Sequence, residues 1–101
     1  MIKHLVMWKL KDFAEGATKE QNARKMKTDL EALKHKIPQI RQIEVGMNFL
    51  PSDFSYDVAL YSEFKNEEDL ALYQKHPEHR SVGVFIQKVS ESRVVVDYKT
   101  N

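Results

Sequence analysis

The chain has 101 residues, with 16 lysines and arginines against 15 aspartates and glutamates, and a formal net charge of +1. This length is typical of one domain with a single hydrophobic core, so we assign residues 1–101 to one unit. Charges of both signs are mixed along the chain, so nucleic acid is not an expected partner. No apolar run is long enough to cross a membrane, and lysines interrupt the first residues, so no signal peptide is expected.

Cysteine is absent from the chain, which excludes disulfides, thiolate catalysis and cysteine-ligated metals. A reducing cytoplasm is therefore the expected compartment. The four histidines do not show the i, i+4 spacing of metal ligands on a helix, and no carboxylate has an obvious place among them. The sequence thus predicts neither a metal site nor a cofactor.

The first part of the chain predicts a strand followed by a long helix. Residues 2–10 alternate in character and are rich in strand formers. Thr18 and Gln21 have the spacing of a capping box, which opens a helix that runs to about Ile37, where Pro38 ends it. The apolar residues of this helix fall three and four apart and form one stripe: Ala23, Met26, Leu30, Leu33 and Ile37.

The second part of the chain predicts three strands and two helices. The strands are expected over 40–48, 56–65 and 92–98, and the helices over 66–75 and 79–89. Asn66 is a favourable N-cap for the first of these helices, and Pro77 separates the two. The order of the elements is therefore β-α-β-β-α-β, which indicates an α+β fold.

Both faces of the predicted strands carry apolar residues. The first strand places Ile2, His4, Val6, Trp8 and Leu10 on one face, and Leu5 and Met7 on the other. A sheet face in contact with water should be polar, and two or three helices can cover only one face. The second face therefore predicts a homodimer, through a contact that includes Leu5, Met7, Val45, Ala59 and Tyr61.

The candidate acid–base residues come from one short segment and one strand. Tyr73, His76 and His79 follow one another closely after a predicted helix, and His4 lies within the apolar face of the first strand. Imidazole and phenol groups suit proton transfer and hydrogen bonding near neutral pH. Strand alternation and the turn at Pro77 predict that His4, Tyr73 and His79 line one pocket on the helix-covered face. Structural roles, as helix caps or hydrogen-bonded core residues, are open for all of them.

Short motifs spread over nearly the whole chain match one family. They are Lys3-His4-Leu5-Val6, Lys9-Leu10-Lys11-Asp12, Gly46, Tyr56-Asp57, Glu63-Phe64, Tyr73-Gln-Lys-His76-Pro77-Glu-His79 and Val96-Asp97-Tyr98. In these residues the chain resembles the stress-responsive A/B barrel domains, dimeric α/β barrels abbreviated Dabb. The resemblance implies a ferredoxin-like sandwich with a four-stranded antiparallel sheet that dimerises into a barrel.

The chain is also distantly similar to a plant member of this family, olivetolic acid cyclase, which closes a linear polyketide by an aldol reaction. The resemblance places the catalytic tyrosine and histidine of that enzyme on Tyr73 and His79. It implies ligand contacts at His4, His76, Val58 and Leu30. Val58 stands where the plant pocket has a histidine, and Leu30 lies where it has an aromatic wall, so we do not infer cyclase activity.

Three functions are open at this point. The leading interpretation is a homodimer with a pocket for a small apolar or carbonyl-containing molecule, because it requires only the matching pocket residues. A cofactor-free cyclase, isomerase or monooxygenase would use His79 as the base and Tyr73 as the donor. A purely structural stress protein would have a filled core and no cavity.

Some plant relatives are associated with a magnesium ion held by main-chain oxygens at the dimer contact, a site that a sequence cannot reveal.

Overall fold

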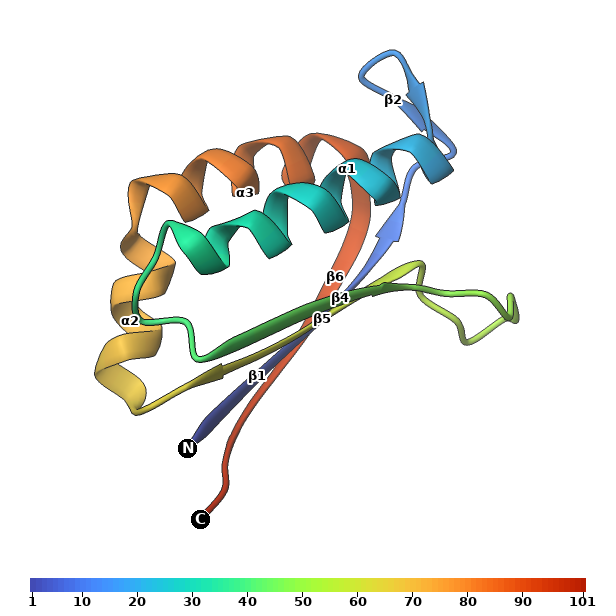
Figure 1. Ribbon diagram of the computed structural model, residues 1–101. Helices are drawn as coiled ribbons and strands as arrows, with labels where there is room; N and C mark the ends of the chain where they lie inside the picture. The colour runs from blue at the N-terminus through green and yellow to red at the C-terminus, as the bar shows by residue number, and fades with distance from the viewer.

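The computed structural model describes residues 1–101 as a four-stranded antiparallel sheet with three helices on one face (Figure 1). The strands lie in the order β4-β5-β1-β6, and a two-stranded hairpin, β2-β3, stands apart from them. The elements are β1 (Ile2–Leu10), β2 (Phe13–Ala14), β3 (Ala17–Thr18), α1 (Lys19–Ala32), the short 3-10 helix η1 (Leu33–His35), β4 (Gln42–Met47), β5 (Val58–Phe64), α2 (Glu67–Lys75), α3 (Pro77–Val89) and β6 (Ser90–Lys99). The expected ferredoxin-like α+β fold is confirmed.

The start of α1 follows from the capping box. The Gln21 backbone N–H donates to Thr18 Oγ1 at 3.2 Å, and the Thr18 N–H donates to Gln21 Oε1 at 3.0 Å. The helix ends earlier than Ile37, because its last turn tightens into η1 before the chain turns. The β2-β3 hairpin ahead of α1 is not predicted by the sequence pattern. Its turn is made by Glu15 and Gly16, both with positive φ.

The junction between α2 and α3 is built around Pro77. Proline occupies the first turn of α3, where its missing N–H costs nothing, so α3 begins at residue 77 instead of 79. His76, the residue before it, is extended, as steric contact with a following proline favours. The Nδ1 atom of His76 accepts a hydrogen bond from the Glu78 backbone N–H at 3.1 Å, which makes this histidine the N-cap of α3.

The core lies between the sheet and the helices. It is formed by the apolar stripe of α1, by Ile86 and Val89 of α3, and by alternate residues of β1 and β5. Val45 belongs to this core, since it pairs with Leu60 and is 1% exposed. The expectation that Val45 lies on the dimer face is therefore wrong. The residues of β4 do alternate between the two faces, but an apolar pattern on both faces does not say which face the helices cover.

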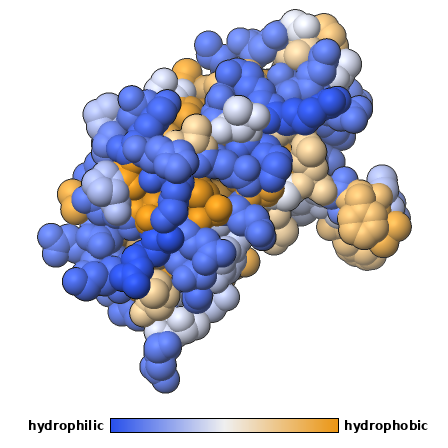
Figure 2. All heavy atoms as spheres, in the orientation of Figure 1, coloured by the Kyte–Doolittle hydropathy of each residue, from blue (hydrophilic) through white to orange (hydrophobic).

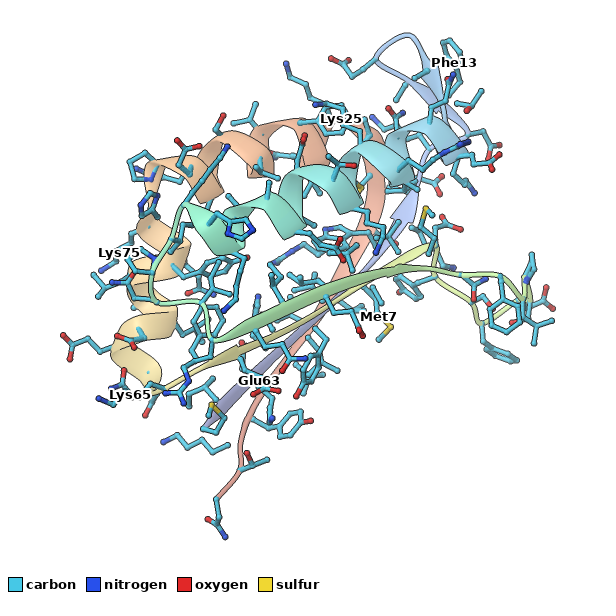
Figure 3. All side chains as sticks on the ribbon, in the orientation of Figure 1. Met7, Phe13, Lys25, Glu63, Lys65 and Lys75 are labelled. Atoms are coloured by element: carbon cyan, nitrogen blue, oxygen red, sulfur yellow. The ribbon has the colours of Figure 1, made fainter.

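The opposite face of the sheet is open. Two rows of residues cross it on neighbouring strands: Glu44, Tyr61, Leu5 and Val96 in one, and Gly46, Ala59, Met7 and Val94 in the other. Figure 3 shows Met7 and Glu63 on this side, away from the helices. Tyr61 donates a hydrogen bond to Glu63 at 2.6 Å, and Lys3 pairs with the same carboxylate at 3.0 Å. The face is thus an apolar centre with a charged margin.

A loop over residues 48–57 projects beyond the sheet between β4 and β5 (Figure 1). Two of its aromatic side chains are almost free of contacts, since Phe49 is 90% exposed and Phe54 is 93% exposed. The loop forms the apolar knob that stands out from the body of the molecule in Figure 2. The loop is anchored at its end by Asp57, whose carboxylate accepts a hydrogen bond from the Leu10 N–H at 2.7 Å.

None of the helices has both the length and the apolar character that crossing a membrane requires.

Candidate functional site

A cavity of about 500 Å³ lies between β1, β6 and the three helices. Its apolar wall consists of Val6, Trp8, Leu30, Leu60 and Ile86. Its polar side chains are His4, Tyr73, His79, Gln87, Ser90, Glu91, Ser92 and Arg93. This volume falls within the range of small-molecule pockets.

His4 enters the cavity wall from the middle of β1. The residue is 2% exposed, and its Nδ1 atom lies 2.5 Å from Oδ1 of Asp97, which the register places directly opposite on β6. A carboxylate accepts hydrogen bonds only, so Nδ1 carries the hydrogen of this bond and Nε2 is left for other partners. Asp97 therefore orients the imidazole and selects its tautomer.

Tyr73 is fully buried and lies in the centre of an aromatic cluster. Its ring centroid is 4.8 Å from that of Phe64, 4.4 Å from that of His79 and 6.3 Å from that of His4. Burial raises the pKa of the phenol well above its usual value, so it stays neutral. Its hydroxyl has no hydrogen-bond partner within the protein. Tyr73 can therefore donate a hydrogen bond to a bound molecule.

His79 lies in the first turn of α3, against the Tyr73 ring. Its Nδ1 atom is 3.2 Å from the Gln74 carbonyl oxygen, so the ring donates there and keeps Nε2 as an acceptor. Burial lowers the pKa of this imidazole, against the opposing effect of the Gln74 hydrogen bond. The positive charge of Arg93 lowers the pKa further. His79 is therefore neutral at pH 7 and can accept a proton.

The structure brings four of the predicted site residues to the cavity and leaves two outside. His4, Tyr73, His79 and Leu30 all line it. His76 does not, because its ring is engaged in capping α3. Val58 does not either, since it is 2% exposed in the core near the far end of β1, opposite Trp8. The expected ligand contacts at His76 and Val58 are thus corrected to a helix cap and a core residue.

Asp97 and Arg93 of β6 reach the site without a role predicted for them from the sequence, although Asp97 lies in the Val96-Asp97-Tyr98 motif. Asp97 and Arg93 reach the site only because β6 pairs antiparallel with β1, which sets Asp97 against His4 and Arg93 against Trp8. The signal that could have found them is this register, since side chains directly opposite on paired strands are neighbours.

The arrangement suits acid–base chemistry on a molecule with a carbonyl group. It offers a neutral imidazole as proton acceptor, a neutral phenol as donor and an oriented His4–Asp97 pair, beside the apolar side chains of the sheet and of α1. No group of three histidine, aspartate or glutamate side chains lies close enough together to hold a metal ion.

Comparisons with known proteins agree with this fold. The model of the stress responsive A/B barrel domain matches residues 2–100. A protein of unknown function from Bacteroides fragilis NCTC 9343, described as dimeric with a ferredoxin-like fold, is 39% identical, with a TM-score of 0.84 over 98% of this chain and 95% of that one. No protein of curated function matches the chain.

Two further solved structures share the fold at lower identity. A dimeric ferredoxin-like protein of unknown function from Thermobifida fusca is 23% identical, with a TM-score of 0.82 over 98% of this chain and 90% of that one. The hydroxynitrile lyase of Passiflora edulis is 17% identical, with a TM-score of 0.82 over 99% of this chain and 93% of that one. With a match that extends over residues 2–100, the chain belongs to the stress responsive A/B barrel domain family.

Proposed function

We propose that the chain works as a homodimer in which each protomer binds a small carbonyl-containing molecule in the cavity between the sheet and the helices. The observation that carries the proposal is the Tyr73 hydroxyl, a fully buried donor in the cavity wall with no partner in the protein. A buried donor without an acceptor costs about 1–3 kcal/mol, and a ligand oxygen would remove this cost. The apolar walls favour the carbon skeleton of such a ligand.

A second function, cofactor-free acid–base catalysis, is favoured by the contact between His79 and Tyr73. In such a reaction His79 Nε2 would take the proton from a carbon next to the carbonyl group. The carbonyl oxygen would then carry the developing negative charge and accept a hydrogen bond from the Tyr73 hydroxyl. Both groups are neutral at pH 7, which is the protonation state that each role needs. One protein of this fold is named a hydroxynitrile lyase, so the fold can carry an enzyme.

The homodimer is supported by the open face of the sheet. Leu5, Met7, Val94 and Val96 form its apolar centre, in two adjacent rows with no helix above them. Patches of this kind mark protein contacts more often than free surface. The 39% identical protein from Bacteroides fragilis is described as dimeric.

The projecting loop extends the same surface. Phe49 and Phe54 line a hollow of about 550 Å³ together with Met7 and Ala59 of the open face. Loop and sheet therefore form one continuous apolar region. We infer that the loop packs against the second copy, because the hollow would otherwise expose two phenylalanine rings to water.

A thermal-shift screen of small ketones and aldehydes tests the binding proposal. Ligands should raise the melting temperature of the native protein, and should do so less for Tyr73→Phe, which removes only the donor. Tyr61→Phe is the matched control, because it makes the same change on the opposite face of the sheet. Compounds that stabilise Tyr73→Phe as strongly as the native protein would contradict the proposal.

A further inference from the structure

Trp8, which also lines the cavity, carries a second donor without a partner. It is the only tryptophan of the chain, lies in the cavity wall and is 4% exposed. Its indole Nε1–H finds no acceptor within the protein. Buried polar groups are nearly always paired, so this donor needs an explanation of its own. The acid–base chemistry of His79 and Tyr73 does not use it.

Trp8 lies far from the acid–base end of the cavity. It shares one face of β1 with His4 and Val6, and His4 is the residue that contacts the Tyr73 ring. A strand advances about 3.3 Å per residue, so the four residues from His4 to Trp8 span roughly 13 Å. On β1 and β5 the wall between these two residues is apolar, formed by Val6 and by Leu60, its partner on β5, while Arg93 of β6 lies opposite Trp8.

We infer that the ligand of this cavity is elongated, with a hydrogen-bond acceptor at each end and an apolar middle, and that Trp8 Nε1–H binds the acceptor remote from Tyr73. This inference rests on the proposed function and deepens it, because it adds the length and the second polar group of the ligand. Trp8 acts here as a residue that determines specificity. An indole can donate one hydrogen bond and accept none, so the remote group of the ligand must be an acceptor such as a carbonyl or ether oxygen.

The single tryptophan makes the test direct. In a ¹⁵N-labelled sample the indole N–H is one resolved NMR signal. The probe is 4-(4-hydroxyphenyl)butan-2-one, which has oxygen at both ends. Its ketone oxygen is the acceptor for Tyr73 and its phenol oxygen the acceptor for Trp8. The control is 4-phenylbutan-2-one, which keeps the ketone and lacks the phenol oxygen. The hydroxyphenyl compound should shift the indole proton downfield, and 4-phenylbutan-2-one should not.

A variant supplies the second measurement. Trp8→Phe keeps an aromatic ring and removes the donor, so it should weaken binding of 4-(4-hydroxyphenyl)butan-2-one about two- to tenfold, the effect of one hydrogen bond. Binding of 4-phenylbutan-2-one should stay unchanged. If Trp8→Phe does not fold, the indole signal of the native protein still decides the matter.

The outcomes separate the two proposals. If both probes shift the signals of His79 and Gly83 while the indole signal stays in place, the cavity binds ligands and the role of Trp8 is rejected. The role of Trp8 is also rejected if Trp8→Phe binds both probes as the native protein does. If neither probe at millimolar concentration moves any cavity signal, the proposed function fails and this inference fails with it.

Discussion

Replacing Gly83 with alanine should stabilise the fold, although the residue lies in the wall of the candidate site. Gly83 is inside α3, and a Cβ atom placed there has no neighbour within 4 Å. Glycine in the interior of a helix is less favourable than alanine by about 0.5–1 kcal/mol, and here no clash opposes the gain. For a domain of this size such a gain raises the melting temperature by about 4 °C.

Gly16→Ala is the control for this prediction. A Cβ at Gly16 also meets nothing within 4 Å, but its φ of +74° lies in the left-handed region. Alanine there should lose about 1–2 kcal/mol from backbone strain alone. Thermal and urea unfolding at one protein concentration would compare the two variants. A loss of stability in Gly83→Ala would refute the reasoning, because it would mean that the space beside α3 is occupied.

Three further predictions concern the dimer and the site. Val96→Asp should shift the protein toward monomer in light scattering, because it would bury a charge in the contact. Val84→Asp on α3 should not, although Val84 is 56% exposed and Val96 is 58% exposed. A Val96→Asp variant that stays dimeric would contradict the sheet-face contact. Phe54→Gln should weaken dimerisation about tenfold or more in sedimentation experiments if the loop packs on the second copy, and an unchanged dimer would exclude that packing. The pKa of His79 is lower in the folded state than in the unfolded chain, so as the pH falls the unfolded chain takes up the His79 proton at a higher pH than the folded protein does. The free energy of unfolding should therefore fall as the pH drops below about 6.5. Urea unfolding between about pH 7 and pH 5 should show a smaller loss for His79→Asn than for the native protein, and equal losses would refute the assigned pKa direction.

Much of the fold was predictable from local signals. The capping box at Thr18, the stripe of α1 and the alternation of β1 are properties of neighbouring residues, and each determines its element without help from the rest of the chain. Element ends were less predictable. The start of α3 depends on whether Pro77 breaks a helix or begins one, and both are ordinary uses of proline.

The candidate site was predictable only in part, because a site depends on register. His4, Tyr73 and His79 could be placed on one face by periodicity and by the turn at Pro77. Asp97 could not be assigned to His4 before the pairing of β1 with β6 was known. Trp8 fits the pattern of a plain core residue, because a burial pattern does not show whether an indole N–H finds an acceptor.

The error at Val45 has a different cause. Both faces of the strands are apolar, so the alternation of β4 fits either assignment of its faces equally well. Pairing of Val45 with Leu60 decides the question in favour of the helix-covered side.

The central claim, that the cavity between sheet and helices binds a small carbonyl compound, is tested most directly by filling it. Gly83→Leu would extend a side chain from α3 into the space that surrounds residue 83, without a clash at the Cβ position. In an NMR titration, some small ketones and aldehydes should shift the signals of the cavity residues in the native protein. The same compounds should not bind to Gly83→Leu, although the spectrum of this variant should show that it is folded. Ligands that bind both proteins equally, or a native protein that binds none of them, would contradict the account.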